Sequence, residues 1–129
     1  MKKVLSFLLL PMLLLTGCTS PAPQTNTYRQ ITAQEAADMM ARETGYIILD
    51  VRSEQEYAAG HIPDAILIPN ETIGSDAIPE LPDKNQLILV YCRSGNRSKQ
   101  AAEKLVRQGY TNIVEFGGVG SWTGELTKD

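Results

Sequence analysis

The residue types needed for nucleophilic chemistry gather in one stretch, residues 91–98, which reads Tyr-Cys-Arg-Ser-Gly-Asn-Arg-Ser. A thiolate is the nucleophilic form of cysteine, and it is favoured at helix N-termini and beside arginine side chains. Cys92 follows an apolar run, and Ser98 is the predicted start of a helix. Gly95 lets the backbone take positive φ angles, so that successive loop amides can point at one anion. We therefore predict that Cys92 is catalytic and that its loop binds an anionic substrate. The residues predicted to bind it are Arg93, Ser94, Gly95, Asn96, Arg97 and Ser98.

The start of the chain has the pattern of an export signal. Two lysines precede an apolar run at residues 4–15, and small residues follow before Cys18, as in a secretory signal peptide. A membrane-spanning anchor is the alternative, but it needs about 20 apolar residues, and Pro11 interrupts this shorter run. Residues 15–18, Leu-Thr-Gly-Cys, resemble the bacterial lipobox, whose cysteine is acylated after cleavage. We expect a signal peptide at 1–17, a lipidated N-terminus and flexible linker at 18–27, and a folded domain at 28–129.

This reading places the protein outside the cytoplasm, anchored to a bacterial membrane by lipid alone and facing the periplasm. Thr19 follows the lipidated cysteine, and in this it resembles lipoproteins that are sorted by default to the outer membrane in bacteria with two membranes. With Cys18 acylated, Cys92 is the only free thiol, and with His61 as the one histidine no metal site is predicted. Cys92 as a small buried apolar residue is the alternative, and the neighbouring arginines argue against it.

Length and composition fit one soluble domain with an appendage. The 129 residues are 43% hydrophobic and 21% charged, which is ordinary for a globular protein. The formal net charge of −3 gives no overall basic footprint for nucleic acid. We expect a monomer that binds no nucleic acid.

Apolar spacing predicts strands that alternate with helices. The predicted helices are residues 33–42, 53–59 and 98–108, and the predicted strands are residues 46–49, 65–68, 86–91 and 112–116. A helical turn is predicted at residues 72–77. Such alternation implies an α/β fold, an open parallel sheet with helices on both faces. Functional crevices of these sheets lie at the carboxyl ends of the strands, which is where Cys92 is predicted to lie.

Several motifs, in order, resemble those of the rhodanese-like family over nearly all of residues 28–129. They are Leu49-Asp50-Val51-Arg52, Glu56-Tyr57, Gly60-His61-Ile62-Pro63-Asp64-Ala65, residues 91–98, and Gly117-Gly118 with Trp122. The resemblance implies a five-stranded parallel sheet and a persulfide on Cys92. It implies transfer of sulfane sulfur from a small anionic donor such as thiosulfate to a thiol or cyanide acceptor, with no metal or organic cofactor. Asp64 departs from the family, which has glycine or a small residue there, and we expect this to affect only a turn.

Two other functions stay open on the sequence. A rhodanese fold can act as a binding or sulfur-carrier module without turnover, although the presence of Cys92 favours an enzyme. The family also contains phosphatases, whose catalytic loop is one residue longer. Here four residues separate Cys92 from Arg97, and the smaller cradle suits a sulfur atom better than a phosphoryl group.

Four further residues lie in the family's motifs without a settled role. Asp50 and Arg52 follow a predicted strand and either brace the loop by ion pairs or bond backbone amides at an ordinary turn. His61 invites a general-base role, but its motif implies a structural turn. Trp122 is expected in the core or in a lid.

Overall fold

The short apolar runs of the sequence form one parallel sheet. The computed structural model describes residues 27–129. Its strands lie in the order β1-β5-β4-β2-β3, and every neighbouring pair is parallel. The strands are Arg29–Gln30 (β1), Ile47–Asp50 (β2), Ile66–Leu67 (β3), Ile88–Cys92 (β4) and Ile113–Gly118 (β5). The predicted open five-stranded sheet is confirmed.

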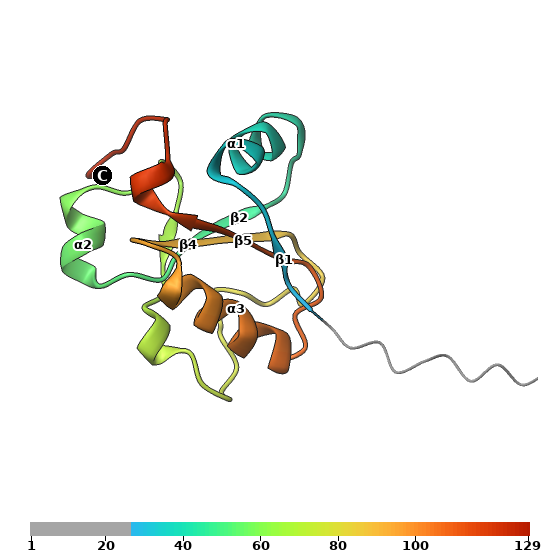
Figure 1. The fold of residues 1–129 in the computed structure, drawn as a ribbon. Helices are drawn as coiled ribbons and strands as arrows, with labels where there is room; N and C mark the ends of the chain where they lie inside the picture. The colour runs from blue at the N-terminus through green and yellow to red at the C-terminus, as the bar shows by residue number, and fades with distance from the viewer. Residues whose placement is uncertain (1–26) are drawn as a thin grey trace, which may run out of the picture.

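The helices of the fold are α1 (Ala33–Arg42), α2 (Glu54–Ala59) and α3 (Asn96–Arg107), with 3-10 turns at Asn70–Thr72 and Val119–Ser121. Figure 1 shows α1 on one face of the sheet, α3 on the other, and α2 beyond the carboxyl ends of the strands. Capping boxes start the first two helices. Thr32 and Glu35 cap α1, and Ser53 and Glu56 cap α2. Helices on both faces are therefore as predicted.

Side chains of the central strand β4 alternate between two apolar cores. Val90 and Cys92 face the core beside α3, whereas Leu89 and Tyr91 face the core beside α1. All of β4 is buried because it pairs with β2 on one side and β5 on the other. A strand covered on both faces reads as a continuous apolar run. This burial holds the strand end at Cys92 in a fixed position beneath α3.

Three local predictions differ from the structure. Residues 65–68 were expected to form a buried strand, but β3 has only two residues and is half-buried because it lies at the edge of the sheet. The helical turn expected at residues 72–77 is wrong: the turn is Asn70–Thr72, directly after Pro69. Strand β1 was not predicted at all, because two exposed polar residues carry no apolar pattern.

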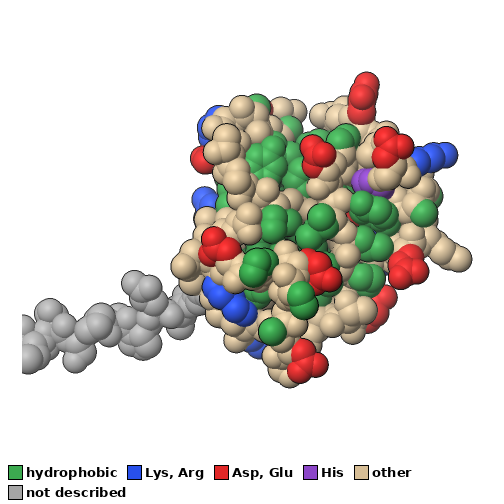
Figure 2. Space-filling model, turned by 180° about the vertical axis from the view of Figure 1, so that it is seen from behind, with side chains coloured by type: hydrophobic (Ala, Val, Ile, Leu, Met, Phe, Trp, Pro, Cys, Tyr) green, Lys and Arg blue, Asp and Glu red, His purple; other side chains and the backbone are tan. Residues whose placement is uncertain are grey.

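The predictions for the signal peptide, the acylated Cys18 and the linker up to residue 26 concern residues outside the described part of the chain. Within residues 27–129, no helix has both the length and the hydropathy needed to cross a membrane. On the face seen in Figure 2, hydrophobic side chains gather in the middle and basic side chains are few and scattered. That face has no continuous basic patch of the kind that binds nucleic acid.

Candidate active site

The loop after β4 turns back over the end of its own strand. The sequence predicts α3 from Ser98, but the helix begins at Asn96 because Gly95 takes the N-cap position. Gly95 has φ 104°, in the left-handed region that glycine adopts without strain. Helix α3 therefore starts directly beside Cys92, with its first amides directed at the strand end.

The sulfur of Cys92 lies among hydrogen-bond donors. Its Sγ accepts a hydrogen bond from the Gly95 amide at 2.9 Å and lies 3.3 Å from Ser98 Oγ. The residue is only 1% exposed, and its other side packs against the core beside α3. Burial raises the pKa of the Cys92 thiol, but the Ser98 hydroxyl and the amides of Ser98, Gly95 and Ser94 outweigh it, so the pKa is lowered overall. The loop thus favours the thiolate.

Glu115 is a residue of this site that sequence reasoning missed. It lies in β5, is 2% exposed, and its Oε1 lies 2.6 Å from Ser98 Oγ. The same oxygen accepts a hydrogen bond from the Gly117 amide at 2.8 Å. The one available signal was a charged residue inside the apolar run of residues 113–116.

Arg97 holds the loop to α2. Its guanidinium donates two hydrogen bonds to Glu56, at 2.7 Å to Oε1 and 2.9 Å to Oε2. The Arg97 bonds lower the pKa of the Glu56 carboxyl from 4.5 to about 2, despite a smaller opposing effect of burial. The ion-pair partner of Arg97 is therefore Glu56 of the second capping box.

Gly118 lies under the loop so closely that no side chain fits. A Cβ on this residue would lie 2.7 Å from the Ser94 amide nitrogen and would overlap the Arg93 carbonyl group. A β-bulge between β4 and β5 brings it there, because Val90 pairs with Glu115 whereas Cys92 pairs with Gly118. Bulges of this kind are common beside active sites. The glycine pair belongs to one of the sequence motifs, and its contact with the loop appears only in three dimensions.

The predicted binding residues of the loop differ in their exposure to solvent. Arg93, Ser94 and Asn96 are exposed, Arg97 is half-buried, and Gly95 and Ser98 are buried. An approaching anion therefore meets the exposed side chain of Arg93 and the exposed part of Arg97, which is paired with Glu56.

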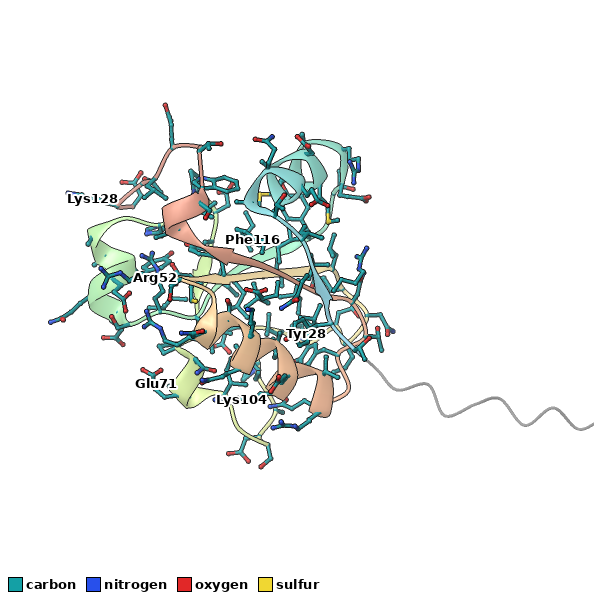
Figure 3. The ribbon with its side chains drawn as sticks, in the orientation of Figure 1. Tyr28, Arg52, Glu71, Lys104, Phe116 and Lys128 are labelled. Carbon is teal, nitrogen blue, oxygen red and sulfur yellow. The ribbon has the colours of Figure 1, made fainter. Side chains whose placement is uncertain are left out.

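Asp50 and Arg52 pair with each other and not with the loop, so of the two interpretations left open the structure shows the turn in which Asp50 bonds a backbone amide. The Arg52 guanidinium donates to Asp50 at 2.7 Å and to the Gly60 carbonyl at 2.7 Å, and the Arg52 amide also donates to Asp50. The Tyr91 hydroxyl donates to Asp50 at 2.6 Å. Figure 3 shows Arg52 between α2 and the strand ends. The pair therefore reaches Cys92 only through the strand, by fixing Tyr91 immediately before it.

His61 lies in a structural turn. It is 2% exposed, its Nδ1 lies 2.8 Å from the Tyr57 carbonyl, and its ring stacks on that of Tyr57 at 3.7 Å.

Trp122 packs on Phe116 at 6.1 Å between ring centres. Among residues 27–129, no three His, Cys, Asp or Glu side chains lie close enough to hold a metal ion.

Comparison with known proteins places this geometry in a family. A family model described as "Rhodanese-like domain" matches residues 32–125. The chain belongs to this family. A relative named "Sulfurtransferase" from Allochromatium vinosum is 34% identical over 94 residues, which are 72% of this chain and 86% of the relative. One named "Thiosulfate sulfurtransferase PspE" from Escherichia coli is 38% identical over 71 residues, 55% of this chain and 68% of that protein.

Solved structures of rhodanese-like proteins share the fold. A rhodanese-like domain protein from Staphylococcus aureus is 32% identical with a TM-score of 0.65, over 78% of this chain and 98% of that one. A structure described as "rhodanese with anions from E. coli" is 34% identical with a TM-score of 0.60, over 65% of this chain and 99% of that one. Together the rhodanese-like relatives support sulfurtransferase activity in general.

Proposed function

We propose that this rhodanese-like protein transfers a sulfane sulfur from a small anionic donor such as thiosulfate to a thiol or cyanide acceptor. The observation that carries the proposal is the Gly95 amide directed at Cys92 Sγ at 2.9 Å in a loop that opens a helix. That geometry supports a sulfur that is ionised before reaction and remains anionic after it.

The reaction has two steps. The Cys92 thiolate attacks the outer sulfur of thiosulfate, a new S–S bond forms, and the old S–S bond breaks with its electron pair leaving on sulfite. The acceptor then attacks the terminal sulfur of the Cys92 persulfide with its own electron pair. A bond forms between the acceptor and that sulfur, the S–S bond to Cys92 breaks, and the thiolate is restored. Covalent catalysis of this kind divides one difficult displacement into two easier ones. Arg93 and Arg97 supply the local positive charge that favours an anionic donor.

Intact mass spectrometry tests the proposal. After incubation with thiosulfate, the protein should gain the mass of one sulfur atom, and cyanide should remove it. Cys92→Ser should gain nothing, whereas Cys18→Ser should gain sulfur as the parent chain does. No gain on the parent chain would reject turnover and favour a binding or carrier module.

For location, we propose that Cys18 carries a lipid and holds the domain at the periplasmic face of a bacterial membrane. The lipobox-like residues 15–18 support this. The protein should sediment with membranes, and with the outer membrane where there are two, while Cys18→Ser should be released or remain unprocessed. A soluble parent chain would reject the anchor.

A further inference from the structure

Glu115 is a buried carboxylate without a cationic partner. In residues 27–129 the ion pairs are Arg52 with Asp50, Arg97 with Glu56 and Arg107 with Glu103, and none of them involves Glu115. Its contacts are instead the Ser98 hydroxyl and the Gly117 amide, both at Oε1. A buried charge held by so few donors is costly unless it has a use. Ser98 links this carboxylate to the sulfur of Cys92.

The Ser98 hydroxyl has one proton, and besides Glu115 and Cys92 the carbonyl oxygens of Gly95, at 3.0 Å, and Gly117, at 3.4 Å, lie within reach of it. Glu115 Oε1 lies 2.6 Å from Ser98 Oγ, the length of a charge-assisted O–H···O⁻ bond, whereas Cys92 Sγ lies 3.3 Å away. While Glu115 is ionised, the Ser98 hydroxyl donates its hydrogen bond to the carboxylate, and an oxygen lone pair of Ser98 faces the sulfur. Cys92 then donates its S–H to Ser98. The three groups form one chain, S–H···O–H···O⁻.

We propose that Glu115 accepts the proton of Cys92 through Ser98. The Cys92 S–H bond breaks and its proton bonds to Ser98 Oγ, while the original Ser98 proton bonds to Glu115 Oε1. The electron pair of the S–H bond stays on sulfur, so the charge moves from Glu115 to Cys92 without a change in total charge. The Ser98 hydroxyl now donates to the thiolate, and the Glu115 carboxyl donates to Ser98. Glu115 does not touch the sulfur, and it acts as a positioning residue that also stores the proton.

The surroundings favour this movement of charge. At Cys92 the charge meets the Ser98 hydroxyl and the amides of three loop residues, and it attracts the Arg97 guanidinium. At Glu115 the charge meets two donors, the Ser98 hydroxyl and the Gly117 amide. Glu115 also acts on the Tyr28 hydroxyl, whose pKa is raised by burial first and then by the charges of Glu103 and Glu115. Figure 3 shows Tyr28 close to α3. No ion pair of the described residues reaches Glu115, whereas the sulfur meets more hydrogen-bond donors than the carboxylate does.

Two groups that share one proton titrate as a pair. Because the proton can move from Cys92 through Ser98, a fraction of the molecules holds the thiolate before the pair has lost its last proton. The reactivity of Cys92 should therefore rise in two steps with a plateau between them. A lone thiol gives a single step.

The test is the alkylation rate of Cys92 by iodoacetamide between about pH 5 and 10, in the full chain. Tryptic digestion releases residues 85–93, so that Cys92 is read separately from Cys18. Glu115→Gln keeps an oxygen for Ser98 and Gly117 but cannot take a proton. It should show one step at higher pH and react about a hundredfold more slowly near pH 6, at the low end of what a positioned base supplies. Ser98→Ala, which removes the link, should lose the plateau as well.

Glu103→Gln is the matched control, since it removes the same charge from an exposed position on α3, and its profile should equal that of the parent chain. Faster alkylation in Glu115→Gln would show that Glu115 only repels the thiolate, and an unchanged profile would show that it takes no part; either result overturns the proposal. A plateau retained in Ser98→Ala overturns it too, even where Glu115→Gln does not fold. The inference deepens the proposed sulfur transfer, but alkylation needs no sulfur donor, so the two can fail separately.

Discussion

Replacement of Glu56 by glutamine should reveal how strongly α2 holds the Cys92 loop. Glu56 serves both the capping box of α2 and the bidentate ion pair with Arg97. Glutamine also fits the third position of a capping box. Glu56→Gln therefore keeps the cap of Ser53 and removes the charge, so that the ion pair is tested by itself.

The magnitude follows from the carboxyl pKa of Glu56, which falls from 4.5 to about 2 mainly through the Arg97 hydrogen bonds. At about 1.36 kcal/mol per pKa unit, the shift sets an upper limit of about 3 kcal/mol. The side chains of Arg97 and Glu56 are 33% and 28% exposed, so solvent screens part of this energy. We expect Glu56→Gln to lower the free energy of unfolding by about 1 to 2 kcal/mol at neutral pH.

The pH dependence gives the sign. A carboxyl whose pKa is lower in the folded than in the unfolded state stabilises the fold above the unfolded pKa and loses that effect as the pH falls. The difference between parent chain and Glu56→Gln should be complete above pH 4.5 and disappear as the pH approaches about 2. Urea unfolding at several pH values measures it, because guanidinium chloride would screen the ion pair.

Glu103→Gln is the control for this measurement. Glu103 pairs with Arg107 at 3.7 Å, with the two side chains 54% and 73% exposed. Its loss should change the free energy of unfolding by less than about 0.5 kcal/mol. Equal stability of Glu56→Gln and the parent chain at neutral pH, or a difference that persists unchanged in acid, would refute the reasoning.

Three further substitutions test the frame of the site. Gly118→Ala places a Cβ 2.7 Å from the Ser94 amide nitrogen, and it should abolish sulfur loading of Cys92 in the intact-mass assay; normal loading would show that the loop can move aside. Tyr91→Phe removes the 2.6 Å hydrogen bond to the buried Asp50, and urea unfolding should show a loss of about 1 to 3 kcal/mol, whereas unchanged stability would contradict it. Asp64 has a positive φ of 69°, so Asp64→Gly should raise stability by about 0.5 kcal/mol, and a lower melting temperature would argue against strain there.

The fold was predictable where local pattern and burial agree. The helix predicted at residues 33–42 is α1, and the apolar run before Cys92 is the central strand β4. Strand β1 was not predicted, because its residues are exposed. Strand β3 was predicted to be longer and more buried than it is, because it is half-buried. The departure at Asp64 was predicted to affect a turn, and it is the one non-glycine residue of the described chain with positive φ.

The chemical parts of the site were predictable from local sequence: a cysteine at a strand end, a glycine that reverses the loop, and a helix that begins there. These depend on backbone preferences of neighbouring residues, which are local. Three contacts depend on the folded chain as a whole: Arg97 binds Glu56, Gly118 lies under the loop, and Glu115 contacts Ser98. Each of these joins residues far apart in the chain through the register of the sheet and the placement of α2 and α3. Such contacts leave no local pattern, because their energy depends on distances that exist only after the chain has folded.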